Sequence, residues 1–292
     1  MATAQPVRVL DVPINGTRLR VEETGAGPPT VVFSHGLFLT QRLFDAPVAT
    51  LAASCRCISY DHRGQGGSGG GGHLGRISDV ECLYGDAVAL IQRLGVTSCH
   101  WVGQSLGSFV GMRLAARRPD LVWSLALLSP RIRRNSRAFV LRADTLCLAL
   151  MAAHPFRAID AELRQRVTEQ IMREMLGPTF MTDPSRAEAR AAFRADLFTR
   201  MIPAAVPAVR GTIRYPANSR QMLAQIKAPT LIIAGEEDYA DGSGVEHARE
   251  VHAAITGSRL LTVPGAGHSL VIEQPEIVSD AVRDFILQTG DV

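Results

Sequence analysis

The sequence predicts an α/β fold, with a mostly parallel sheet of about eight strands flanked by helices and with an inserted helical cap. Short apolar runs such as TVVFSHG (30–36) and WSLALLSP (123–130) are typical of strands covered on both faces. Segments with helical spacing alternate with these runs, which favours a parallel sheet between helices. The alternation stops over 131–226, where about four helical stretches occur without a convincing strand.

The first half of the chain supplies six expected strands and two helices. Two antiparallel strands should meet at Asn15-Gly16, because this dipeptide tolerates the positive φ of a two-residue hairpin turn. An apolar stripe over 79–94, followed by Gly95, predicts a helix and its end. The remaining elements are strands at 30–36, CRCISYDHRG (55–64) and CHWVGQS (99–105), a helix over 106–118 and the strand at 123–130.

The second half completes the sheet after the insertion. A strand in APTLIIAGEED (228–238), a helix near 245–255, a strand in RLLTVPGAGH (259–268) and a closing helix over about 275–287 are expected. The predicted organisation is a core domain of residues 1–130 and 227–292, with a helical cap, or lid, over 131–226 inserted between core strands.

Composition excludes several classes of function. The net charge of +3 is too small to indicate a nucleic-acid partner. Neither an apolar run of about 18 residues nor a signal peptide is evident, so we expect a cytoplasmic protein without a membrane partner. A single lysine, Lys227, stands beside 30 arginines, which favours a GC-rich bacterial genome and leaves little scope for lysine-dependent mechanisms. The five cysteines lack metal-ligand spacing, so reduced thiols and no metal site are expected.

GQSLG (103–107) fits the pattern Gly-x-Ser-x-Gly between an apolar strand and a helix. Such a turn strains the central residue, and Gly103 and Gly107 are small enough to let strand and helix approach. Ser105 would then present its hydroxyl at a helix N-terminus, where a developing anion is favoured. The pattern predicts Ser105 as a nucleophile.

A nucleophilic serine needs a base and an acid from elsewhere in the chain. His268 follows the last predicted strand, at the same edge of the sheet as Ser105, and is the expected base. Asp238 ends the preceding strand and gives the order serine, acid, histidine. Three nearby residues are rival acids: Glu236, Glu237 and Asp241.

The other histidines have plainer interpretations. His35 ends a strand and would shape the backbone there, whereas His62 and His73, on a glycine-rich loop, would lie at a rim. The remaining four fit core or solvated helix positions: His100, His154, His247 and His252.

The motifs SHGLF, DHRGQGGS, GQSLG, GEED and GHSLVIEQPE, in this order, resemble those of α/β-hydrolases across nearly the whole chain. The resemblance implies an oxyanion hole made by the backbone N–H groups of Leu37 and Leu106. It also implies two-step acyl transfer: Ser105 attacks a carbonyl, and water then releases the acid with the help of His268. No cofactor is implied.

We call the strand-to-helix turn at 103–107 the elbow. A serine at the centre of the elbow argues against haloalkane dehalogenases and epoxide hydrolases, and the position of Lys227 argues against hydroxynitrile lyases. An esterase or lactonase remains, similar to the capped group of enol-lactonases, arylesterases and perhydrolase-like enzymes. Its partner would be a small-molecule ester or lactone, and a homo-oligomer is possible. Carbon–carbon bond hydrolases, and receptors or signalling proteins that retain the triad, stay open as alternatives.

The expected substrate pocket is partly apolar. Phe38, Leu39 and Gln104 are assigned to it, and Leu37 and Leu106 would also line its acyl side. Five arginines between 131 and 142 offer either a partner for a substrate carboxylate or a solvated helix face.

The stretch GQGGSGGGGHLG (64–75) follows a strand but has no lysine and opens no helix, so it does not fit a phosphate-binding loop. By resemblance it is the Asp-x-Arg-Gly-x-Gly-x-Ser loop lengthened by glycines at 69–72. Asp61 and Arg63 should fix its root, Gly64 and Gly66 should permit its turns, and the extra glycines should form a mobile tip.

Overall fold

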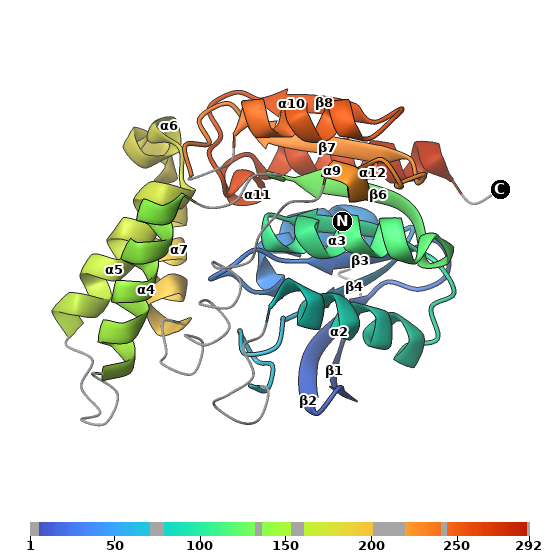
Figure 1. The fold of residues 1–292 in the computed structure, drawn as a ribbon, viewed down its shortest axis with the longest axis horizontal. Coiled ribbons are helices and arrows are strands. Elements are labelled where there is room, and N and C mark those ends of the chain that lie inside the picture. The colour runs from blue at the N-terminus through green and yellow to red at the C-terminus, as the bar shows by residue number, and fades with distance from the viewer. Residues whose placement is uncertain are drawn as a thin grey trace.

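The computed structural model describes residues 6–70, 79–131, 136–152, 161–200, 220–240 and 244–290. These residues contain one eight-stranded sheet in the order β1-β2-β4-β3-β5-β6-β7-β8, with helices on both faces (Figure 1). The predicted fold class is confirmed. The strands are β1 Val7–Ile14, β2 Thr17–Thr24, β3 Thr30–Ser34, β4 Arg56–Tyr60, β5 Cys99–Gln104, β6 Val122–Leu128, β7 Thr230–Gly235 and β8 Arg259–Val263.

Two strand pairings are antiparallel and the others are parallel. β1 and β2 form the predicted hairpin, in which Asn15 and Gly16 take φ values of 44° and 72°. β2 pairs with β4 in the second antiparallel contact, and the six strands from β3 to β8 run parallel to one another. The loops that leave the carboxyl ends of these six strands therefore meet at one edge of the sheet.

Helices α2 (Val80–Arg93), α3 (Leu106–Arg117) and α10 (Val245–Ala254) cover one face of the sheet. Asp79 caps the N-terminus of α2, because its carboxylate accepts the N–H of Cys82 at 2.8 Å. Helices α1 (Asp45–Leu51) and α12 (Pro275–Thr289) pack together on the other face. Each face thus has its own apolar cluster of buried side chains.

The helices inserted between β6 and β7 lie to one side of the sheet in Figure 1. They are α4 (Arg137–Ala152), α5 (Ala161–Met175), α6 (Pro178–Thr182) and α7 (Ala187–Arg200). Buried side chains of α5 and α7, such as Ile171 and Phe193, belong to the same apolar cluster as α1 and α12. The described part of this insertion contains no strand, whereas the limits of a cap domain stay a prediction.

Short elements complete the described chain: η1 (Gln41–Phe44), η2 (Pro119–Leu121), η4 (Pro184–Arg186), α9 (Arg220–Leu223) and α11 (Leu270–Glu273). α9 packs on α3 and α10, so the chain has already returned to the core by Leu223.

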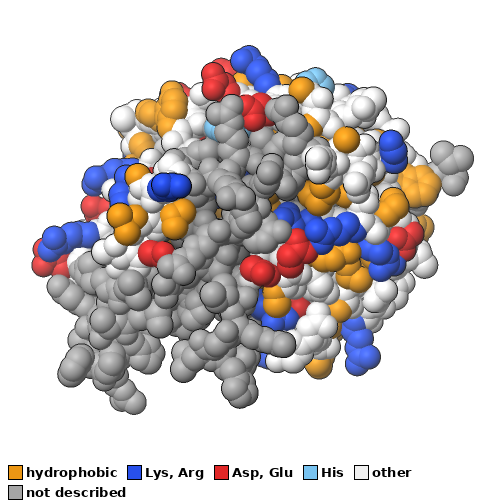
Figure 2. Space-filling view, viewed as in Figure 1, with side chains coloured by type: hydrophobic (Ala, Val, Ile, Leu, Met, Phe, Trp, Pro, Cys, Tyr) orange, Lys and Arg blue, Asp and Glu red, His pale blue; other side chains and the backbone are white. Residues whose placement is uncertain are grey.

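On the face drawn in Figure 2, arginine and acidic side chains are interspersed. Among the described helices, none has the length and apolar character needed to cross a membrane.

Candidate active site

Ser105 stands between β5 and α3 with φ 51° and ψ −104°, a conformation that non-glycine residues rarely adopt. Its N–H donates to the carbonyl of Leu128 on β6 at 2.9 Å. A Cβ at Gly107 would lie 1.8 Å from the carbonyl oxygen of Ser34, and one at Gly103 would lie 2.3 Å from that of Gly107. The strained turn therefore depends on both glycines, as the motif predicts.

Three side chains from distant loops form one hydrogen-bonded series. Nε2 of His268 lies 2.9 Å from Oγ of Ser105, and Nδ1 lies 2.9 Å from Oδ2 of Asp238. An ionised carboxylate only accepts hydrogen bonds, so with neutral imidazole Nδ1–H donates to Asp238 and Nε2 accepts from the serine hydroxyl. The structure thus brings together the three residues predicted as nucleophile, base and acid.

The structure also distinguishes Asp238 from its rivals. The carboxylate of Glu236 accepts from the hydroxyl of Thr262 at 2.9 Å, and that of Glu237 accepts from the N–H of Thr179 at 2.8 Å. Asp241 lies outside the described residues. Of the acidic residues described here, Asp238 is the one bonded to His268.

The backbone of His268 is held from the sheet side. Its carbonyl accepts from Nε2 of Gln104 at 2.7 Å and from the hydroxyl of Ser129 at 3.0 Å. Gln104 immediately precedes Ser105, so nucleophile and base share one support. Sequence reasoning did not identify this role for Ser129, and its only local sign is its position at the end of a strand. The side chain of Gln104 is fully buried, and its assignment to the substrate pocket stays a prediction.

His35 and His62 fix the loop that carries Leu37. Nε2 of His35 accepts the N–H of His62 at 3.0 Å, so Nδ1 carries the proton and donates to the carbonyl of Gly36 at 2.7 Å. Burial, together with the neighbouring His35, lowers the pKa of His62 well below its usual value, which keeps this ring neutral. Because C=O and N–H of a trans peptide point in opposite directions, holding the Gly36 carbonyl also fixes the direction of the Leu37 N–H.

The expectation that His35 shapes the backbone is therefore confirmed, whereas placing His62 at a rim was wrong. His62 is buried, because its ring packs edge-on against His35 and Tyr60. His73 lies outside the described residues.

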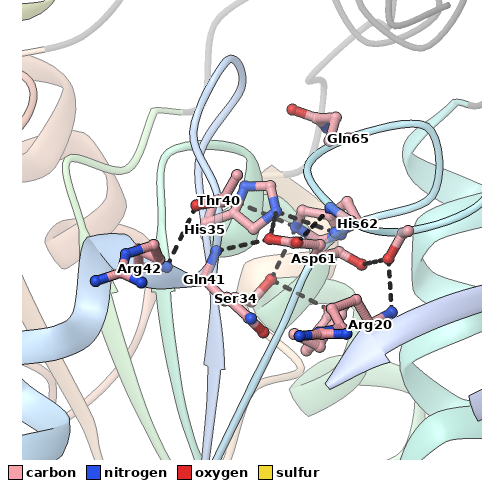
Figure 3. A network of polar contacts seen from close by, with 12 residues as sticks. Arg20, Ser34, His35, Thr40, Gln41, Arg42, Asp61, His62 and Gln65 are labelled. Atoms are coloured by element: carbon pink, nitrogen blue, oxygen red, sulfur yellow. Dashed lines mark hydrogen bonds and ion pairs between the residues drawn. The ribbon is translucent and has the colours of Figure 1, made fainter. Parts of the chain in front are cut away.

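Asp61 organises the root of the glycine-rich loop (Figure 3). Its carboxylate accepts the N–H groups of Gln41 at 2.8 Å and of Gly67 at 2.7 Å. Gly66 has φ 53°, and a Cβ there would lie 2.2 Å from this carboxylate, so the predicted need for glycine is confirmed. Arg63 forms a buried ion pair with Asp86 of α2. Of the glycines at 69–72 that were expected to form a mobile tip, those at 71 and 72 lie outside the described residues.

Leu37 and Leu106, whose N–H groups are predicted to form an oxyanion hole, both lie beside Ser105. Leu106 is the first residue of α3, and Leu37 follows Gly36, whose Cβ position lies 3.4 Å from Cβ of Ser105. Hydrogen bonds between described residues do not engage the N–H of either leucine. The adjacent N–H of Phe38, which has φ 64°, donates to Oε1 of Gln65 at 3.2 Å.

The side chains assigned to the pocket differ in exposure. Leu37 and Phe38 are partly buried against the apolar clusters, and Leu39 is buried. In the arginine-rich stretch, the guanidinium of Arg131 lies 5.5 Å from the centroid of the Phe109 ring on α3. Positions 132–135 lie outside the described residues, so the role of this stretch stays a prediction.

Glu273 lies behind the triad and was not identified from the sequence. Its side chain is fully buried, and Oε2 accepts the N–H groups of Gly177 at 2.7 Å and Gly267 at 2.9 Å. Burial, opposed by these hydrogen bonds, raises the pKa of Glu273 to about 7. The signal in the sequence that could have identified Glu273 is an acidic residue at the end of the otherwise apolar segment LVIE.

This raised pKa makes stability depend on pH. The folded protein binds the Glu273 proton more tightly than the unfolded chain, so the stabilisation is present below the ordinary value of 4.5 and is lost as pH rises through about 7. We expect Glu273→Gln, measured against wild type by urea unfolding, to gain about 3 kcal/mol in relative stability from pH 4.5 to pH 8. Exposed Glu276→Gln should show no such trend, and an equal trend in both variants would contradict the assignment.

Comparisons with known proteins agree with this architecture. A sequence profile described as the alpha/beta hydrolase family matches residues 31–281. The chain is 28% identical over 272 residues to BpoC, named as a candidate non-heme bromoperoxidase, of Mycobacterium tuberculosis, covering 91% of this chain and 97% of that protein.

Two solved structures share the fold. One, a thermophilic esterase from Thermogutta terrifontis, superposes with a TM-score of 0.83 at 22% identity, covering 98% of this chain and 100% of that one. The other, the enol-lactonase from Burkholderia xenovorans, has a TM-score of 0.80 at 22% identity, covering 94% and 99%. With the profile match over most of its length, the chain belongs to the α/β-hydrolase family.

Proposed function

We propose that this protein is a serine hydrolase that cleaves a carboxylic ester or lactone through an acyl-enzyme on Ser105. The observation that carries the proposal is the series Ser105, His268, Asp238, with 2.9 Å at both contacts. A serine hydroxyl becomes nucleophilic when a base removes its proton, and His268 is within reach to do so. Asp238 keeps the imidazole in the required tautomer and stabilises its protonated form.

In the first step, Oγ of Ser105 bonds to the carbonyl carbon while its proton passes to Nε2 of His268. The carbonyl electron pair moves to oxygen, and the N–H groups of Leu37 and Leu106 would bind this oxyanion. The tetrahedral intermediate collapses, and His268 gives the proton to the departing alkoxide. Water then attacks the acyl-enzyme with His268 as base, and the acid leaves as Ser105 regains its proton.

The residues around Ser105 favour an acyl group with apolar character. Phe38 and Leu39 follow the Leu37 amide, and we propose that they line the acyl side of the pocket together with Gln104. Arg131 follows β6 at the same edge of the sheet and would favour substrates that carry a carboxylate elsewhere. In a lactone the leaving alkoxide stays attached to the acyl group, so the same chemistry applies to rings.

The proposal is tested by a hydrolysis screen over short and long p-nitrophenyl esters, aryl esters and lactones of increasing ring size. We expect turnover of at least one class, with an initial burst equal to the concentration of active sites. A fluorophosphonate should add one phosphonyl group per chain, and mass spectrometry of the proteolysed protein should locate it on Ser105.

Other outcomes would point to other functions. Cleavage of a carbon–carbon bond without ester turnover would favour the alternative hydrolase class. Absence of both turnover and labelling would contradict the enzyme proposal and favour a receptor or signalling protein that retains the triad.

A further inference from the structure

Residues 175–179, which comprise the end of α5, the start of α6 and the loop between them, are hydrogen-bonded to both loops that carry the triad acid and base. We call this contact the seam. The carbonyl of Met175 accepts the N–H of Ser269, next to His268, at 2.8 Å. The N–H of Thr179 donates to Glu237, next to Asp238, at 2.8 Å, and its hydroxyl bonds to the same carboxylate. The seam therefore joins the inserted helices to the candidate active site.

Glu273 lies at the centre of the seam. One oxygen, Oε2, binds the N–H of Gly177 from the inserted segment and the N–H of Gly267, the residue before His268. The other oxygen, Oε1, is buried and has no hydrogen-bond partner among the described residues. A single carboxylate oxygen thus bridges the insertion and the histidine loop.

The backbones on either side of this bridge touch. A Cβ at Gly267 would lie 2.3 Å from the backbone nitrogen of Gly177, and one at Gly177 would lie 2.7 Å from Oε2 of Glu237. The two backbones are therefore in contact, and a shift of the inserted segment toward the histidine loop would displace Gly267. Since Gln104 and Ser129 hold the carbonyl of His268 from the opposite side, its backbone is fixed between the elbow and the seam.

We propose that Glu273 is a positioning residue that ties the inserted helices to His268, so that the placement of these helices and the geometry of the base are set together. The role rests on the proposed function of the triad. Hydrolysis requires Nε2 within hydrogen-bond reach of Ser105, and a misplacement of about 1 Å is enough to lower the rate about 100-fold. A glutamine at 273 retains an acceptor oxygen for both N–H groups, whereas alanine leaves both without a partner.

The kinetic test compares Glu273→Ala, Glu273→Gln and the exposed control Glu276→Ala, using the p-nitrophenyl ester that the wild type hydrolyses fastest. We expect Glu273→Ala to lower kcat about 100-fold with KM changed less than about threefold, because geometry rather than ester binding is altered. Glu273→Gln should stay within about fivefold of wild type, as the retained oxygen rescues the bridge. Circular dichroism should show that all variants are folded.

Equal losses in Glu273→Ala and Glu273→Gln, or a loss in Glu273→Ala no larger than in Glu276→Ala, would overturn the proposal. The bridge itself is measured without turnover, by amide hydrogen exchange in peptides covering 175–182 and 264–272. Glu273→Ala should raise exchange in both peptides, and Glu273→Gln should raise it less. Unchanged exchange in Glu273→Ala would refute the bridge. If exchange rises as expected in the variants but the wild type hydrolyses no ester, only the proposed function is refuted.

Discussion

Replacing Ser105 with alanine is expected to lower kcat/KM for the best ester by about 10⁵- to 10⁶-fold. The hydroxyl oxygen of Ser105 is the atom that would bond to the carbonyl carbon. Among the described residues, Ser105 is the serine whose hydroxyl is hydrogen-bonded to Nε2 of His268, at 2.9 Å. Residual turnover would come from the backbone N–H groups and from binding alone. Steady-state kinetics at equal protein concentration measure the change, and fluorophosphonate labelling should be lost in the variant.

The matched control is Ser279→Ala, which removes another buried serine hydroxyl, on α12. That hydroxyl has no partner among the described residues, so its loss should leave both activity and labelling unchanged. Hydrolysis and labelling that survive in Ser105→Ala would show that another residue is the nucleophile.

Arg63→Ala is expected to destabilise the protein by about 3–5 kcal/mol, because it leaves the carboxylate of Asp86 buried without its counter-ion. Both side chains are more than nine-tenths buried, and the hydrogen bond to Asp86 raises the pKa of Arg63. The remaining partner of Asp86 would be Asn15, whose Nδ2 donates to it at 2.9 Å. Urea unfolding followed by circular dichroism at pH 7 measures the loss.

The control for this ion pair is Arg118→Ala, which breaks an exposed contact with Asp120 at 2.5 Å. Solvent screens that pair, so no measurable change in unfolding is expected. Replacing both Arg63 and Asp86 with apolar residues should recover much of the lost stability, since no buried charge then remains. Equal effects of Arg63→Ala and Arg118→Ala would show that the buried pair contributes no more than the exposed one.

Features set by a few adjacent residues were predictable. The hairpin at Asn15 depends on the local tolerance of positive φ, and the elbow at Ser105 depends on five consecutive residues between a strand and a helix. His268 was predictable because the carboxyl ends of parallel strands share one edge. Each of these predictions used a pattern that sterics impose on the local chain.

Other features were missed because they depend on neighbours far away in the sequence. Helix α1 (Asp45–Leu51) is short and contains Pro47, and its packing against α12 is not visible in its own seven residues. His62 looked like a rim residue beside so many glycines, yet Tyr60 and His35 enclose it. A local pattern does not report which surfaces will later cover a side chain.

The sequence by itself determined the α/β alternation, the strained serine and the edge of the sheet at which a base would lie, because these follow from backbone sterics and strand direction. Only the tertiary structure selected Asp238 over Glu236 and Glu237, and only it brought Glu273 to the amides of Gly177 and Gly267. Ser105 and His268 are 163 residues apart. Contacts over such separations depend on the packing of whole elements, because this packing decides which of several similar side chains comes within hydrogen-bond distance of its partner.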